Sequence, residues 1–225
     1  YFNMSELNKE DNKNKSDFGR PSPLVFVFLL FLVYWTINAF LESGCFDKVI
    51  FSSDSEYYFE VISKYIDSKD LKFHLRSSEE AGDKVKIFDY VKAHINNFVS
   101  EGDSFALGLP TAPLRNSNHV KESMDMFIDY QLSIFSAVEY DFSVQFAFSC
   151  TDYLKTGKRW EPLLGSKSPM ISGNTRSQDQ KSYYHPNGAI YILKPEDIKG
   201  KAKTFYENGI PYIMDRNFSI DIDTQ

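Results

Sequence analysis

Residues 46–76 read FDKVIFSSDSEYYFEVISKYIDSKDLKFHLR, and this stretch decides the fold class. Its first apolar run, 49–51, is short and of the kind that forms a buried parallel strand. Apolar residues then recur at helical spacing over 55–66 and alternate with polar residues over 71–75, as in a second strand. A strand, a helix and a strand in this order predict a right-handed crossover. The chain is therefore expected to be an α/β domain with a doubly wound, mostly parallel sheet.

The rest of the chain continues this succession of strands and helices. We expect helices at 83–98 and 117–130, a helical turn at 195–200, strands at 105–109, 187–193 and 212–223, a strand-rich segment at 136–149, and mostly loop at 151–186. A chain of 225 residues can bury one substantial core, so we expect a single domain over 1–225.

Bulk composition limits the classes of partner. The net charge is −6, whereas a nucleic-acid partner would call for clustered Lys and Arg. A nucleotide substrate held by a few local cations remains compatible with this charge. Cys45 and Cys150 form neither a disulfide framework nor a zinc pattern, and two thiols in this length fit the cytoplasm. The four histidines have no metal-ligand spacing and are expected to be surface or packing residues.

The composition changes sharply within the first forty residues. Residues 1–20 are polar and rich in lysine and asparagine, which indicates a solvated segment, whereas 24–41 contains no charge. A proline at the start of this run and a glycine after it predict a helix over 23–43. Two interpretations stay open: a buried core helix, which is apolar all round, and a membrane anchor, because eighteen uncharged residues reach the lower limit for a bilayer span.

Near the C-terminus, FSIDIDT (218–224) alternates apolar and acidic residues. In an extended strand, Ile220 and Ile222 would face one side, and Asp221 and Asp223 the other. The Cα atoms of the two acids would lie about 6.5–7 Å apart, and their oxygens could converge on one hard cation such as Mg²⁺. The pattern fits equally a half-buried edge strand with two solvated acids.

Polar clusters follow the ends of several expected strands. In an open α/β sheet, ligands bind beyond the carboxyl ends of the strands. The clusters are 52–55, 76–83, 111–115 and the acidic pair near the C-terminus, and the loop 172–187 adds Arg176, Gln178 and Asn187. Several such clusters at successive strand ends predict a pocket for an anionic substrate.

Five segments, taken in order, carry a resemblance to a known family. They read ESGCFDKVIFSSDSE (42–56), LPTAPLR (109–115), SGNTRSQDQ (172–180), HPNGAIYIL (185–193) and SIDIDT (219–224). Together they resemble the acylneuraminate cytidylyltransferases, from about Tyr34 to Gln225. The resemblance implies a Rossmann-like fold of the nucleotide-diphospho-sugar transferase type. It also implies a homodimer in which a protruding segment reaches the partner's pocket.

The reaction that the resemblance implies is transfer of CMP from CTP to a nonulosonic acid, a nine-carbon 2-keto sugar acid of the sialic or legionaminic type, with release of pyrophosphate. Mg²⁺ is the implied metal, and the family's metal carboxylates, which are also the catalytic residues, fall on Asp221 and Asp223.

Other substrate contacts follow from the same resemblance. Arg176, Gln178 and Asn187 match the sugar-acid loop, where a guanidinium can pair bidentately with a carboxylate. Two further matches are Arg76 and Asp83, near the cytidine, and Arg115, in the proline-rich turn. A surface ion pair between Arg76 and Asp83, and a structural role for Arg115, are the alternatives.

The opening segment departs from the family. An apolar strand and a glycine-rich phosphate loop are normal there, and this chain has none of those glycines. A gapless overlay puts Lys9, Lys13 and Asn14 on polar, substrate-binding positions of that loop, and about eight extra apolar residues precede Tyr34. The family's final helix is also missing after Thr224. We therefore expect impaired turnover, and the alternative is a non-catalytic homologue that binds a sugar acid or a partner subunit.

Overall fold

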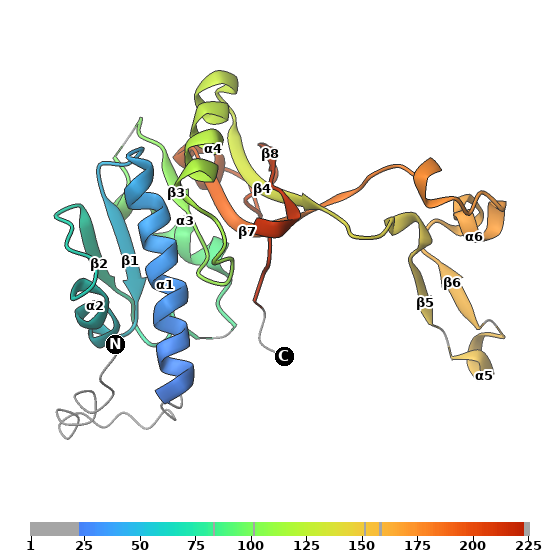
Figure 1. Ribbon diagram of the computed structural model, residues 1–225, viewed down its shortest axis with the longest axis horizontal. Coiled ribbons are helices and arrows are strands. Elements are labelled where there is room, and N and C mark those ends of the chain that lie inside the picture. Colours follow the sequence, from blue (N-terminus) through green and yellow to red (C-terminus); the bar gives the residue numbers. More distant parts are fainter. Residues whose placement is uncertain (1–22, 83, 101, 151, 158, 223–225) are drawn as a thin grey trace.

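The computed structural model describes residues 23–82, 84–100, 102–150, 152–157 and 159–222 (Figure 1). The helices are α1 (Pro23–Ser43), α2 (Glu56–Ser63), α3 (Ile87–Phe98), α4 (Ser117–Tyr130), α5 (Tyr153–Thr156), α6 (Pro169–Ser172) and α7 (Pro195–Lys199). The strands are β1 (Val49–Ser53), β2 (Leu71–Leu75), β3 (Phe105–Leu107), β4 (Ser133–Glu139), β5 (Phe148–Cys150), β6 (Trp160–Pro162), β7 (Tyr184–Leu193) and β8 (Gly209–Ile213). Short 3₁₀ turns lie at Val144–Phe146, Gly165–Lys167, Ser177–Asp179 and Arg216–Phe218.

The segment that decides the fold class forms as predicted. Strands β1 and β2 pair in parallel, from Val49 opposite Leu71 to Ser53 opposite Leu75, and α2 makes the crossover between them. Val61 and Ile62 on α2 are buried together with Leu71 in one apolar cluster. The strand–helix–strand prediction is confirmed.

The larger sheet has four strands in the order β3-β7-β4-β8. Strand β8 runs parallel to β4, whereas β7 is antiparallel to both of its neighbours. The register between β4 and β7 shifts between Phe135 and Ala137. At this irregularity the Ser136 hydroxyl accepts a hydrogen bond of 2.8 Å from the backbone N–H of Ile190, which keeps that buried donor satisfied.

Helices cover both faces of this sheet, so both faces of β7 are buried. Ile190 and Ile192 pack with α1 and α4 in one core cluster. Tyr191 and Leu193 point to the opposite face and pack with α3 and α7 in a second cluster. Alternate residues of one strand therefore enter two cores, and the doubly wound α/β architecture is confirmed.

Within the described residues, β1–β2 and the four-stranded sheet are separate sheets rather than one continuous sheet. Strand β3 is hydrogen-bonded to β7 alone among the described strands. The apolar strand with which the resembling family opens would fall before α1, in residues that the structure does not describe.

Helix α1 confirms the helix predicted over 23–43 and ends at Gly44, whose φ of +65° suits a glycine stop. Ile37, Ala39 and Phe40, in its C-terminal half, are buried, whereas Leu24 and Phe28, in its N-terminal half, are 79% and 48% exposed. The interpretation as a fully buried core helix is therefore wrong for the N-terminal half. By length and composition alone, Leu24–Ser43 could cross a membrane. Within the protein, 33% of an 18-residue window of this helix is buried, and Ala39 and Phe40 pack into the core.

Residues 140–183 leave the sheet between β4 and β7 and form a protruding arm (Figure 1). At its base, the backbone N–H of Tyr140 donates to the carbonyl of Tyr183 over 3.0 Å. The antiparallel pair β5–β6 and the one-turn helices α5 and α6 lie along it. Strand β5 falls at the end of the segment predicted to be strand-rich, 136–149, whereas the prediction of mostly loop at 151–186 missed β6, α5 and α6. Elements of three or four residues leave no periodicity in a sequence.

The last strand ends earlier than predicted. Strand β8 stops at Ile213, a 3₁₀ turn follows at Arg216–Phe218, and 219–222 forms no strand. The Asp215 carboxylate caps that turn by accepting from the backbone N–H of Asn217 over 2.8 Å. Ile220 is 54% exposed, so the apolar positions do not line a buried face. The strand prediction for 214–222 is wrong because the turn takes the chain away from the edge of β4.

A glycine on the C-terminal side of β3 tests the packing of α1 on the sheet. A Cβ atom at Gly108 would lie 2.4 Å from Cε2 of the buried Phe40 ring, so Gly108→Ala must displace that ring. We expect urea unfolding to show a loss of about 1–3 kcal/mol. Lys121→Ala, an exposed change on α4, is the control, with a change within about 0.5 kcal/mol. Equal stabilities for the two variants would contradict this packing.

Candidate functional site

Three of the five motif segments meet at one place through hydrogen bonds. The backbone N–H of Ile222 donates to the carbonyl of Thr111, in the loop after β3, over 2.8 Å. The Asn187 side chain, at the start of β7, donates to the Ser219 hydroxyl over 3.0 Å. The segment that carries Asp221 is thus held between the loop after β3 and the start of β7.

Asn187 is 2% exposed and acts as the anchor of this junction. Besides Ser219, its amide nitrogen reaches the Met214 sulfur at 3.3 Å, and its oxygen accepts from the backbone N–H of Ala189 at 3.2 Å. The side chain is therefore committed to protein partners rather than directed into solvent. In this chain, Asn187 holds the segment that carries the acid.

Asp221 is exposed, and its negative charge contributes to the raised pKa of the Tyr191 hydroxyl. Burial, together with a hydrogen bond to Tyr206 and the charge of Asp221, raises the pKa of the Tyr191 hydroxyl. The two phenolic oxygens lie 3.2 Å apart. Tyr191 therefore stays protonated at neutral pH, with its hydroxyl paired to that of Tyr206.

The donor set fits a metal that takes most of its ligands from the substrate. Among the described residues, no group of three or more His, Cys, Asp and Glu side chains could hold an ion, and Asp223 lies outside them. Mg²⁺ characteristically uses one or two protein carboxylates and completes its shell with phosphate oxygens and water. Asp221, alone or with Asp223, fits that requirement.

Arg76 follows β2, and its environment is half-buried. Its backbone N–H donates to the carbonyl of Ser53 over 2.8 Å, and its guanidinium carbon lies 5.2 Å from the centre of the Tyr90 ring. The Nε atom is buried without a hydrogen-bond partner in the described part of the chain. Asp83, with which it was expected to act, lies outside that part.

Arg115 turns inward and is 3% exposed. Its Nη2 donates to the carbonyl of Leu109, and its guanidinium carbon lies 5.7 Å from the centre of the Phe40 ring. Burial lowers the pKa of this guanidinium to about 9, so it remains charged at neutral pH. The contact with Leu109 closes the proline-rich turn and supports the structural role, while Nε and Nη1 are buried without a hydrogen-bond partner among the described residues and are compatible with substrate binding.

Arg176 and Gln178 belong to the arm, in the segment of chain between α6 and β7. Both are exposed, and the Arg176 side chain makes an ion pair of 3.8 Å with Asp179. Within one chain the structure therefore joins Asn187 to the segment of Asp221 but does not bring these two residues to it. Lys9, Lys13 and Asn14 lie outside the described residues.

Sequence reasoning missed a polar cluster at the ends of β1 and β2. Ser52, His74 and Tyr90 meet there with mutual distances of 3.1 Å between their polar side-chain atoms. The 52–55 cluster pointed to Ser52, but His74 was taken for a surface or packing residue. The signal was the alternation in 71–75, which puts His74 on the opposite face from Leu71 and Phe73.

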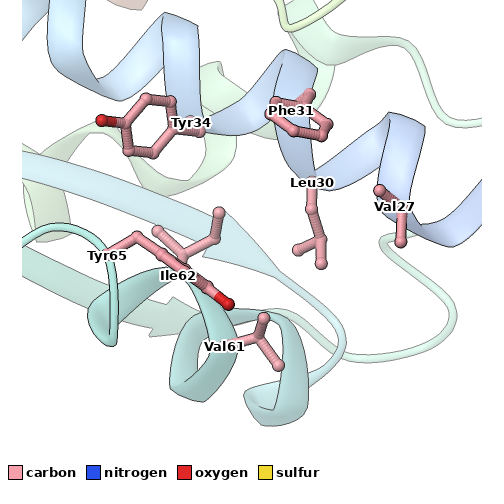
Figure 2. A pocket seen from close by; sticks show the side chains of 7 residues that line it. All are labelled: Val27, Leu30, Phe31, Tyr34, Val61, Ile62 and Tyr65. Carbon is pink, nitrogen blue, oxygen red and sulfur yellow. The ribbon is translucent and has the colours of Figure 1, made fainter. Parts of the chain in front are cut away.

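A cavity of about 260 Å³ lies between α1 and α2 (Figure 2). Its lining is apolar apart from the Tyr34 and Tyr65 hydroxyls, and it contains no charged side chain. A nucleotide or a sugar acid would find no counter-charge there, so this cavity is not the substrate site.

Helices on both faces of the sheet, and an acid held near the loop after a strand, define a doubly wound α/β protein with a candidate site at a strand end. A cytidylyltransferase family model matches residues 23–223, and the chain belongs to this family.

Two relatives illustrate the membership. An N-acylneuraminate cytidylyltransferase of Escherichia coli is 31% identical over 195 residues, which cover 85% of this chain and 43% of that protein. A pseudaminic acid cytidylyltransferase of Campylobacter jejuni is 28% identical and covers 86% of this chain and 80% of the relative. The chain thus spans less than half the length of the N-acylneuraminate cytidylyltransferase that it matches.

A solved structure of CMP:2-keto-3-deoxy-manno-octonic acid synthetase with CTP aligns with 83% of this chain and 79% of its own. The identity is 10% and the TM-score 0.48. The fold assignment therefore rests on the strands, helices and cores of this chain itself.

Replacing the anchor of the junction should release the acidic segment. Asn187→Ala removes both donor contacts and leaves the Ser219 hydroxyl and the Ala189 N–H without this partner. We expect a loss of about 1–3 kcal/mol of unfolding free energy and faster amide hydrogen exchange at 219–222. The exposed Asn96→Ala on α3 is the control. Unchanged exchange at 219–222 would show that other contacts hold the segment.

Proposed function

We propose that this chain transfers CMP from CTP to a nine-carbon 2-keto sugar acid of the sialic or legionaminic type and releases pyrophosphate. The observation that carries the proposal is the junction of three motif segments at Thr111, Asn187 and Ser219. It holds Asp221 next to the loop after β3, on the side where open α/β sheets bind their ligands. Membership of the cytidylyltransferase family gives the class of reaction.

In the proposed reaction, the anomeric hydroxyl of the sugar acid attacks the α-phosphorus of CTP. A new oxygen–phosphorus bond forms, the bond to the β-phosphate oxygen breaks, and pyrophosphate leaves. Such transfer depends mainly on positioning and on neutralisation of charge. Bound Mg²⁺ would supply that neutralisation at the phosphate oxygens, held by Asp221 and Asp223.

The substrates' other groups have candidate partners on this chain. We propose that Arg76 binds the cytidine side; its buried Nε, which has no hydrogen-bond partner among the described residues, supports this. Lys9, Lys13 and Asn14 are proposed to neutralise the triphosphate in place of the family's glycine-rich loop. Without those glycines fewer backbone amides can approach the phosphates, so we propose weak turnover.

We further propose a homodimer in which the arm completes the partner's site. Arg176 and Gln178 lie on the arm, whereas Asn187 and Asp221 lie in the body of the chain. The arm also exposes large apolar side chains, among them Phe142 at 63% and Leu163 at 63%. Exposed apolar surface of this kind marks interaction sites. We also propose a cytoplasmic location. Both cysteines, Cys45 and Cys150, are free thiols, and free thiols are typical of proteins in a reducing compartment.

A second candidate function is a non-catalytic homologue that binds the sugar acid or a partner subunit. The observation that favours it is the absence from the sequence of the family's phosphate-loop glycines. Calorimetric titration separates the two candidates. Binding of CTP supports the enzyme, and binding of a sugar acid without CTP supports the homologue.

The central test of the enzyme is release of pyrophosphate. Purified protein with CTP, Mg²⁺ and a panel of nonulosonic acids should release pyrophosphate with at least one acid, and Asp221→Ala should lower the rate about 100-fold or more. Asp129→Ala, an exposed acid on α4, is the matched control and should retain the rate. Absence of pyrophosphate with every acid would overturn the proposal.

The contribution of the arm in trans can be tested by mixing variants. Arg176→Ala and Asp221→Ala should each be nearly inactive alone. When equal amounts of the two variants are mixed and reassembled, about half of the dimers contain one chain of each variant. One of the two sites in such a mixed dimer carries neither defect, so about a quarter of the wild-type activity should return. If the arm served its own chain, every site would carry one defect and no activity would return.

A further inference from the structure

The guanidinium of Arg76 lies on an aromatic ring and, among the described residues, not beside a carboxylate. Its carbon is 5.2 Å from the centre of the Tyr90 ring, a distance typical of a cation–π contact. Arg76 makes no ion pair with any acid in the described part of the chain. Among the described residues, Tyr90 is therefore the side chain that positions this guanidinium, and its Nε has no hydrogen-bond partner there.

Tyr90 is itself fixed by a triangle of polar atoms. Its hydroxyl lies 3.1 Å from the Ser52 hydroxyl and 3.1 Å from Nδ1 of His74, and these two are 3.1 Å from each other. Two hydroxyl protons and one ring nitrogen can make two hydrogen bonds among themselves in either tautomer of His74. The phenol ring, which is 5% exposed, is thereby held in one orientation.

A second set of contacts holds the turn that follows Arg76. One oxygen of the Glu80 carboxylate accepts from the backbone N–H of Ser77 at 3.1 Å and from its hydroxyl at 2.9 Å. The other oxygen lies 2.6 Å from Nε2 of His94, whose ring centre is 4.8 Å from that of Tyr90. These hydrogen bonds, led by those from Ser77, lower the pKa of Glu80, so the carboxylate is ionised at neutral pH.

The two sets of contacts converge on one side chain. The turn at Ser77–Glu80 fixes the backbone next to Arg76, and the triangle fixes the ring beneath its guanidinium. Both are tied to α3, through His94 and Tyr90. An arginine held in this way loses little side-chain entropy when a ligand binds, which favours affinity.

We propose that Tyr90 is a positioning residue for Arg76, fixed by Ser52, His74 and the Glu80–His94 pair, and that it sets this guanidinium for the bound nucleotide. The identity of the ligand rests on the proposed function. The positioning of Arg76 by Tyr90 does not, and it can be measured without any ligand.

The ligand-free measurement is the NMR signal of the Arg76 Nε–H group, assigned by its loss in Arg76→Lys. In the wild-type protein the Tyr90 ring should shift it upfield. Tyr90→Phe keeps the ring and should retain most of the shift, whereas Tyr90→Leu should move the signal to the position of exposed arginines. Tyr130→Phe, an exposed phenol on α4, is the control. A signal that is unchanged in Tyr90→Leu would overturn the positioning role.

The ligand measurement is a double-mutant cycle with CTP titrated in a calorimeter. We expect the dissociation constant for CTP to rise about tenfold in Arg76→Lys and in Tyr90→Leu. In His94→Gln it should rise severalfold, and this variant should still fold because His94 is only half-buried. If Tyr90 acts through Arg76, the double variant Arg76→Lys/Tyr90→Leu binds no more weakly than Arg76→Lys alone, within about twofold. A further tenfold loss in the double variant would show that Tyr90 acts on the fold in general.

Wild-type protein that does not bind CTP would overturn the proposed function and, with it, the role of Arg76 in binding the nucleotide. The NMR result would still decide whether Tyr90 positions Arg76.

Discussion

Burial of β7 on both faces is the constraint on which the rest of the structure depends. Ala189, Ile190, Ile192 and Leu193 are at most 1% exposed, and the strand is hydrogen-bonded to β3 on one side and β4 on the other. A strand so enclosed has one register and one orientation. Its first residues therefore leave the sheet at a fixed place, which is where the arm returns and where Asn187 holds the segment of Asp221. One packed strand thus determines the position of the acid and of the base of the arm.

The two arginines that follow β2 and β3 show how burial divides structural from ligand-binding roles. Both lie over aromatic rings, at 5.2 and 5.7 Å. Arg115 is almost fully enclosed and donates to the backbone of its own turn, so its cation helps to hold that turn. Arg76 is only half-buried and has no acid beside it among the described residues. The same residue type after two different strands therefore suits different tasks.

The sequence was sufficient to predict the elements that bury a periodic apolar face. Helix α1 and the β1–α2–β2 unit followed directly from such periodicity, and β7 from an apolar run after a turn. The tail at 219–222 was mispredicted because alternation specifies two faces but not a neighbouring strand to pair with. Ile220 alternates correctly and is nevertheless exposed.

The triangle of Ser52, His74 and Tyr90 could not be predicted from the sequence, because its members are 16 to 38 residues apart and become neighbours only when β1, β2 and α3 pack. Similarly, nothing local in the sequence could show that Arg176 and Asp221 lie on different parts of the molecule.

The central claim is that Asp221 holds a metal-bound nucleotide whose base lies toward Arg76. A crystal structure of the protein with CTP and Mn²⁺, the latter located by its anomalous scattering, tests this most directly. The account predicts a manganese peak within coordination distance of the Asp221 carboxylate and of the phosphates, with the cytosine or ribose in contact with Arg76. Nucleotide bound elsewhere, or a metal with no contact to Asp221, would contradict it.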